Sequence, residues 1–190
     1  AWGGVLVHPA ILMLLLATLV QIAGQFTLFA YLASELRRAA GADAAGVALG
    51  LTLFGVAGLL GSILSARFVS RLSAGTTQLL CQGAMATGLA AWSLGAHVLP
   101  LALAAVFVLG LGFGGGVSMQ QARLIAVAPL LATASVALNT SFLYVGQAGG
   151  ASLGGALIAR GVPDGLGPAG LGLMLVAIAL SWAAKRRFGA

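Results

Sequence analysis

Three polar side chains that could bind a solute lie on one face of the first apolar segment, residues 9–33. Thr18, Gln21 and Gln25 follow one another at three- and four-residue spacing, and Phe29 continues the series, which places all four on one side of a helix. An amide in hydrocarbon without a partner costs roughly 1–3 kcal/mol. We therefore expect Gln21, Gln25 and Phe29 to line a substrate cavity, with hydrogen bonding between helices as the alternative.

A second amide lies in the fifth apolar segment, residues 129–159. Asn139 stands roughly two turns inside this segment, and Phe142 follows on the same face. An amide beside an aromatic ring suits an amphipathic organic ligand, although ordinary packing would use the same pair. We predict that Asn139 and Phe142 belong to the same cavity.

This sequence lacks the set of residues that nucleophilic catalysis needs. Ser118 precedes a methionine, and both histidines, His8 and His97, come before it near the ends of apolar segments. An activated serine needs a base within hydrogen-bonding reach. The single cysteine, Cys81, lies inside an apolar run, without a set of metal ligands. We expect a protein that is not an enzyme and that uses no metal or cofactor.

The acidic residues lie where they cannot carry protons through a membrane. Proton-coupled transporters usually titrate a carboxylate within the bilayer. All three acids of this chain, Glu35, Asp43 and Asp164, fall at connectors between apolar segments. If protons drive this protein, the titrating group must therefore belong to another part of the machine.

Composition and segment length predict a membrane-embedded helical bundle. Only 6% of the 190 residues are charged, 61% are hydrophobic and the mean hydropathy is +1.10, whereas about a quarter of a soluble domain is charged. Unbroken apolar runs exclude the alternating pattern of a barrel, and a helix spans a bilayer with about 20 apolar residues. We predict an all-α membrane protein, a single domain of six transmembrane helices at about 9–33, 44–66, 75–94, 99–121, 129–159 and 165–184.

The basic residues indicate the orientation of these spans. With the N-terminus inside, the outer connectors carry three charges of each sign, and the inner connectors and tail carry six basic residues and no acid. The positive-inside rule then places both termini in the cytoplasm, beneath an inner or plasma membrane. The net charge of +6 comes from segment ends, which argues against nucleic-acid binding. We expect Gln120 and Gln121 to lie at the membrane–water interface. The six basic residues of the inner connectors and tail are Arg67, Arg71, Arg123, Lys185, Arg186 and Arg187.

The two halves of the chain share a short pattern. Residues 60–67 and 153–160 agree at five of eight positions, with an offset of 93. They end spans two and five, which cross in opposite directions, as in the three-plus-three inverted repeats of secondary transporters. Chance agreement in a chain rich in Leu, Gly and Ala is the alternative.

Three glycines of the fifth segment recur at four-residue spacing: Gly146, Gly150 and Gly154. They are predicted to let helices pack closely, in a rocking or a static bundle.

The stretch from Gly55 to Arg71 resembles the second-half copy of the signature loop of the major facilitator superfamily. Gly61, Arg67 and Arg71 fit its glycine and two basic positions, whereas Ala66 stands where an acid is usual. This departure weakens the charge relay of the loop. Residues 24–32 and 139–155 are similar to the seventh and eleventh spans of twelve-span drug:proton antiporters, within which arabinose-efflux-permease-like exporters are nearest.

This resemblance covers nearly the whole chain and implies the C-terminal six-span half of an exporter. It implies an N-terminal six-span half as partner, a central cavity, and exchange of a small drug- or sugar-like molecule for protons by alternating access. Gly61, Arg67 and Arg71 would shape a cytoplasmic gate loop, in which the arginines bond helix-end carbonyls of other spans. Because the sequence begins at Ala1 without a methionine, we also expect a fragment of a longer chain.

Two other functions stay open at this point. The chain could work as a six-span transporter that forms a homodimer, without a second half. From a different class, it could be a membrane scaffold or assembly partner that transports nothing. The nearly neutral polar residues of the expected cavity disfavour multiply charged solutes but separate sugars from drugs poorly.

Overall fold

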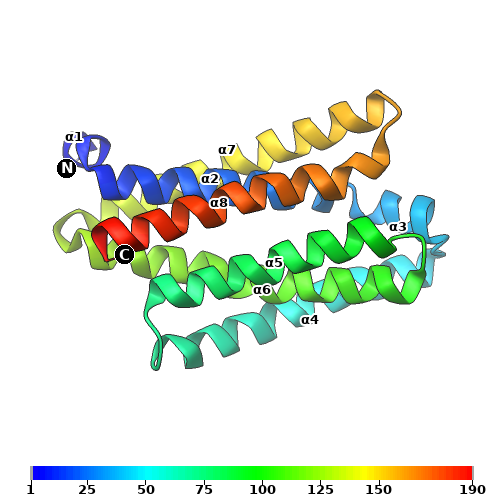
Figure 1. Ribbon diagram of the computed structural model, residues 1–190, viewed down its shortest axis with the longest axis horizontal. Helices are drawn as coiled ribbons and strands as arrows, with labels where there is room; N and C mark the ends of the chain where they lie inside the picture. Colours follow the sequence, from blue (N-terminus) through cyan, green and yellow to red (C-terminus); the bar gives the residue numbers. More distant parts are fainter. Residues whose placement is uncertain (1, 190) are drawn as a thin grey trace.

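The computed structural model describes residues 2–189, apart from the side chains of residues 2, 3 and 6, and this part of the chain is helical, without a strand. Long helices run side by side along the longest axis of the molecule (Figure 1). The helices are α1 (Trp2–Val7), α2 (Pro9–Phe29), α3 (Leu32–Ala40), α4 (Ala44–Val69), α5 (Ala74–Gly95), α6 (Leu99–Val127), η1 (Pro129–Leu131), α7 (Ala132–Ala159), η2 (Pro163–Gly165) and α8 (Leu166–Phe188).

Local signals explain where these helices begin and end. Proline occupies one of the first two positions of α2 and α6, where its missing N–H breaks no helical hydrogen bond. Asp43 caps α4 by accepting a 2.8 Å hydrogen bond from Gly46 N, and Ser73 caps α5 through a 3.2 Å bond from Thr76 N. α3 ends at Gly41, whose φ of 65° favours glycine.

Five stretches of the described chain are long and apolar enough to cross a membrane. They are Pro9–Phe29, Ala44–Val69, Leu99–Val127, Pro129–Ala159 and Pro163–Phe188. α5 is not among them: it has 22 residues, but Thr76, Thr77, Gln78 and Gln82 make its first half polar. The five apolar helices indicate an α-helical membrane protein in which a sixth, more polar helix of similar length runs alongside.

Several helix ends differ from those predicted. The first helix stops at Phe29 rather than at residue 33, and the chain then turns into a separate amphipathic helix, α3. α6 continues to Val127, beyond the predicted end at residue 121, and the last helix runs through the basic cluster to Phe188. In α6 and α8, helical hydrogen bonding thus continues past the point where the apolar residues stop.

Two central helices each pack along two others. α2 lies against α7 and α8, α6 lies against α4 and α5, and contacts between α5 and α8 join the two groups. Glycine permits the closest approaches: Gly150 of α7 lies against the backbone of Ala23, and Gly114 of α6 lies against the backbone of Gly58. The bundle is therefore two three-helix groups joined along α5 and α8.

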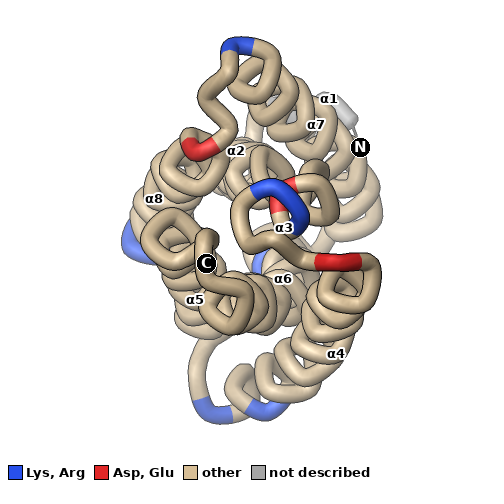
Figure 2. The backbone as a smooth tube through the Cα atoms, turned by 90° about the vertical axis from the view of Figure 1, so that its right-hand side faces the viewer, with Lys and Arg blue, Asp and Glu red and all other residues tan. Residues whose placement is uncertain are grey.

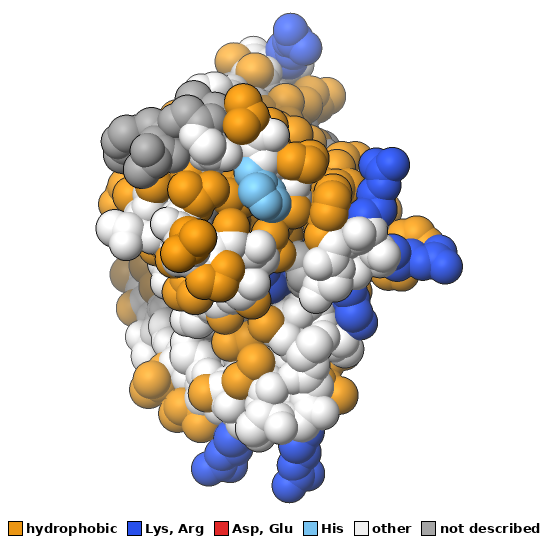
Figure 3. Space-filling model, turned by 90° about the vertical axis from the view of Figure 1, so that its left-hand side faces the viewer, with side chains coloured by type: hydrophobic (Ala, Val, Ile, Leu, Met, Phe, Trp, Pro, Cys, Tyr) orange, Lys and Arg blue, Asp and Glu red, His pale blue; other side chains and the backbone are white. Residues whose placement is uncertain are grey.

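The two ends of the bundle differ in charge. α1, the α4–α5 and α6–α7 connections and the end of α8 lie at one end (Figure 1), which we call the basic end. Seen from there, basic side chains project outward and no acidic side chain is visible (Figure 3). The opposite end carries α3 and the three acidic residues, mixed with arginines (Figure 2).

An ion-pair network holds α3 in place at this opposite end. Arg38 donates to Glu35 Oε2 at 2.8 Å and to Asp164 Oδ1 at 2.6 Å, which ties α3 to η2. The hydrogen bonds to Glu35 and then Asp164 raise the pKa of Arg38. Because Glu35 is buried, its carboxylate needs this cation. With Asp43 capping α4, each of the three acids has a local structural partner.

Candidate functional site

Six polar side chains from four helices meet inside the bundle, in its half nearer the basic end. Each is at most 3% exposed. A buried polar group is stable only where it is hydrogen-bonded, so this set forms an internal network, which we call the polar cluster. Its members are Gln21 of α2, Gln78 and Gln82 of α5, Gln120 and Arg123 of α6, and Ser181 of α8.

Gln21 is the centre of the contact between α2 and α5. Its Oε1 accepts hydrogen bonds from the side-chain amides of Gln78 and Gln82, each at 2.8 Å. Gln82 also donates to Ser181 Oγ at 2.9 Å, which adds α8 to the network. In this conformation Gln21 joins helices, which is the alternative that its sequence pattern left open, and sequence reasoning missed its two partners on α5.

Arg123 is a buried cation. The prediction that it lies in a connector is wrong. Arg123 belongs to α6 and is 1% exposed. One guanidinium nitrogen donates to Ser181 O at 2.9 Å and another to Gln120 Oε1 at 3.2 Å, while Gln120 donates to Leu14 O. Gln120 is therefore buried rather than interfacial. The three-residue spacing of Gln120 and Arg123 was the available signal, since it places both on one helical face.

Asn139 and Phe142 lie on α7 where it meets α2. Thr18 Oγ1 donates to Asn139 Oδ1 at 2.6 Å, so this amide bonds the neighbouring helix. Phe142 is half-buried and packs in a cluster of apolar side chains that includes Leu14 and Leu124. In this conformation Asn139 therefore bonds a helix neighbour, and Phe142 belongs to an apolar cluster.

Gln25 differs from the other interior amides. It is 0% exposed, and neither its Nε2 nor its Oε1 has a hydrogen-bond partner in the part of the chain that the structure describes. Gln78 and Gln82 likewise leave their Oε1 atoms unused there. An unsatisfied buried polar group costs about 1–3 kcal/mol. The interior thus retains hydrogen-bonding capacity that the described side chains do not use.

Phe29 belongs to a row of aromatic rings that leads to the bundle surface. Its ring centroid lies 4.3 Å from that of Phe54, which lies 5.7 Å from that of Phe113. Phe54 and Phe113 border an open, mainly apolar groove of about 460 Å³ between α4 and α6, in which Ser62 and Ser118 are the polar side chains. Sequence reasoning did not predict this groove, because its residues are far apart in the chain.

The predicted packing glycines form one line on α7, and this line faces α2. A Cβ atom at Gly146, Gly150 or Gly154 would collide with the carbonyl oxygens of Leu19, Ala23 and Thr27 respectively. The partners advance by four residues on both helices, so α2 and α7 run parallel and in register. Only glycine allows this close approach.

The predicted gate-loop residues divide into one buried glycine and two exposed cations. Gly61 packs against the backbone of Leu111 on α6. Arg67 and Arg71 are exposed, and their guanidinium groups make no hydrogen bond or ion pair with any described residue. The hydrogen bonds expected from these arginines to helix-end carbonyls of other spans are therefore absent within residues 2–189.

No known protein-family model matches this sequence. The interior offers neutral amides, hydroxyl groups and one guanidinium, whereas the three carboxylates of the chain lie at the opposite end. Such an interior can hydrogen-bond a neutral or singly charged organic molecule.

Proposed function

We propose that this chain is the C-terminal six-helix half of a transporter of the major facilitator type, which exports small organic molecules by alternating access in exchange for protons. An N-terminal six-helix half is its partner, and the central solute path runs between the two. Both termini of the chain face the cytoplasm, and α5 crosses the membrane as the sixth span.

The observation that carries this proposal is the equivalent packing of the two sets of three long helices. In this comparison α2 corresponds to α6, α4 to α7 and α5 to α8. The contacts of α2 with α7 and α8 then correspond to the contacts of α6 with α4 and α5. The contact between α5 and α8 is unchanged when the two sets are exchanged. Because the two sets run in opposite directions, this scheme is the one expected of an inverted repeat, a frequent construction in secondary transporters.

The glycine contacts support a moving bundle. Gly150 against Ala23 in one group corresponds to Gly114 against Gly58 in the other, and both contacts join parallel helices without side chains between them. Backbones that meet in this way can shift without repacking large side chains. Alternating access requires such displacements.

Gln25 is the residue that we assign to the solute path. A purely structural amide should have a partner, as Gln21 has, but Gln25 bonds no described residue. A bound solute would satisfy both of its polar atoms when the cavity opens. Since the described spans hold no carboxylate, the proton-carrying acids belong to the partner half.

Flux measurements on the full-length protein test this assignment. Reconstituted in proteoliposomes with a pH gradient, the protein should export members of a panel of drugs and sugars, and Gln25→Met should lower the rate at least several-fold without changing membrane insertion. Thr87→Ala, at an exposed position on α5, is the control and should export normally. A wild-type protein that moves none of the solutes would favour a scaffold, and full activity in Gln25→Met would remove this residue from the path.

A further inference from the structure

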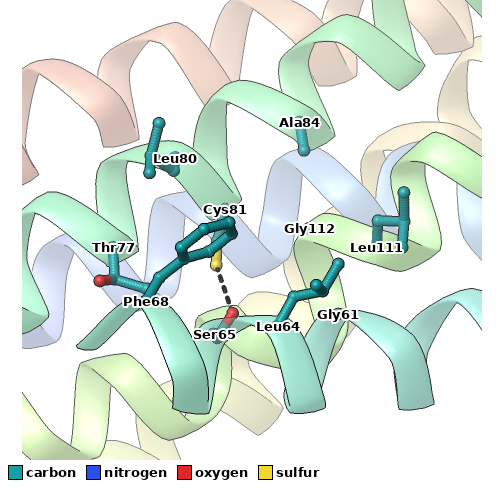
Figure 4. A pocket seen from close by; sticks show the side chains of 10 residues that line it. All are labelled: Gly61, Leu64, Ser65, Phe68, Thr77, Leu80, Cys81, Ala84, Leu111 and Gly112. Carbon is teal, nitrogen blue, oxygen red and sulfur yellow. Dashed lines mark hydrogen bonds between the residues drawn. The ribbon is translucent and has the colours of Figure 1, made fainter. Parts of the chain in front are cut away.

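An apolar groove opens between α4 and α5, over α6, near the basic end. Its volume is about 180 Å³, and its apolar lining includes Leu64, Phe68, Leu80, Ala84 and Leu111 (Figure 4). Leu64, Phe68 and Leu80 remain 42%, 44% and 53% exposed. The groove therefore lies on the outer surface of the six-helix bundle.

The few polar side chains of this groove are already paired. Ser65 Oγ and the Cys81 Sγ on the groove floor lie 3.3 Å apart and form a hydrogen bond (Figure 4). Thr77 Oγ1 donates to Ser73 O at 3.1 Å. The groove therefore offers few polar groups, each of them already bonded within the bundle, and its apolar lining suits an apolar chain.

A basic hollow adjoins the groove at the C-terminal end of α4. Arg67, Ser70 and Arg71 line this hollow, and it shares Leu64 and Phe68 with the groove. The two guanidinium groups are exposed and have no hydrogen-bond or ion-pair partner among residues 2–189. Because every acid of the chain lies at the opposite end, an anion that pairs with these two arginines would come from outside the chain.

We propose that the groove and its basic hollow bind one anionic phospholipid, with an acyl chain between α4 and α5 and the headgroup phosphate against Arg67 and Arg71. Arginine pairs strongly with phosphate through two parallel hydrogen bonds, and basic residues at the cytoplasmic ends of spans attract anionic lipids. A free anion would leave the groove empty, and a zwitterionic lipid would bring a second cation beside the two arginines, whereas an anionic lipid brings its phosphate without one. This site depends on the membrane setting but not on transport.

Native mass spectrometry of the full-length protein in detergent tests the proposal. Phosphatidylglycerol should bind more tightly than phosphatidylcholine of the same chain length. Arg67→Gln/Arg71→Gln should weaken phosphatidylglycerol binding roughly tenfold or more and abolish the preference. Arg37→Gln/Arg160→Gln is the matched control, because it removes two exposed arginines from the opposite end, and it should bind as the wild type does.

Two further measurements distinguish the site of the acyl chain from the site of the headgroup. Ala84→Leu, which fills the groove, should weaken binding of both lipids, and phosphatidylglycerol should slow alkylation of Cys81 by N-ethylmaleimide. Equal binding by wild type and Arg67→Gln/Arg71→Gln, or an equal loss in the control variant, would overturn the proposal. Displacement of the lipid by glycerol phosphate at matched concentration would also overturn it, in favour of a free-anion site. Melting temperatures without lipid should agree among the wild type and the two double-arginine variants, since those four arginines lie on the surface.

Discussion

At the scale of single residues, Gln21 and Gln25 show how neighbours with the same pattern come to differ. They lie one turn apart on the same face of α2, and both are buried. Gln21 accepts hydrogen bonds from two amides of α5, whereas Gln25 bonds no described residue. The difference depends on what α5 places opposite each of them. The position of a residue on a helix face therefore predicts its burial but not its hydrogen-bond partners.

Removal of the Gln21 amide should destabilise the bundle. Gln21→Met leaves Gln78 Nε2 without its acceptor, while Gln82 keeps its bond to Ser181. One unsatisfied buried donor should cost about 1–3 kcal/mol, measured by denaturation in mixed micelles. Gln25→Met is the matched control and should be as stable as the wild type or more so, because no bond is lost. Equal losses in both variants would mean that both amides are structural.

The buried polar residues also mark how far the sequence could predict the site. The stripe of Thr18, Gln21 and Gln25 was visible from its spacing alone. The burial of Arg123 was not, because an arginine near the end of an apolar run normally extends to the water interface. Its hydrogen bonds to the carbonyl of Ser181 and the side-chain oxygen of Gln120 help to hold it inside the bundle. Those contacts depend on tertiary packing.

At the scale of elements, the glycines of α7 set its distance from α2. Gly150 faces the backbone of Ala23, whereas Gly149, the adjacent residue, has no atom within 4 Å of the place where its Cβ would lie. The four-residue spacing predicts such a line of glycines, but it does not say which helix lies opposite.

These adjacent glycines allow a direct test of close packing. Gly150→Ala should lower the melting temperature in detergent by several degrees, because the new methyl group collides with the Ala23 carbonyl. Gly149→Ala should leave it unchanged or raise it, since alanine favours a helix by about 0.8–1.0 kcal/mol over glycine. If Gly150→Ala is as stable as Gly149→Ala, the two helices do not depend on this approach.

Helix starts and helix ends differ in how well the chain specifies them. Pro9, Asp43 and Ser73 mark helix starts through local chemistry that acts within a few residues. The extension of α6 to Val127 instead depends on Gln120 and Arg123 finding partners on other helices. For this reason hydropathy alone ended that span too early.

At the scale of the whole molecule, the polar character of α5 decides how the fold is placed in the membrane. α5 is the helix whose amides bond Gln21 and Ser181, so its polar side faces the interior rather than lipid. A helix of this kind can span a bilayer despite lower hydropathy, because its polar groups are satisfied by neighbouring helices.

Cysteine labelling on the two sides of α5 tests this placement. Arg71 and His97 are exposed and flank the helix at its opposite ends. In a Cys81→Ala background, a membrane-impermeant maleimide should label His97→Cys in intact cells, and it should label Arg71→Cys only after permeabilisation. Arg160→Cys, also at the end opposite the termini, is the control and should behave like His97→Cys. If both flanks of α5 react from one side, α5 does not cross the membrane, and the α5–α8 contact that joins the two three-helix groups cannot lie within the bilayer.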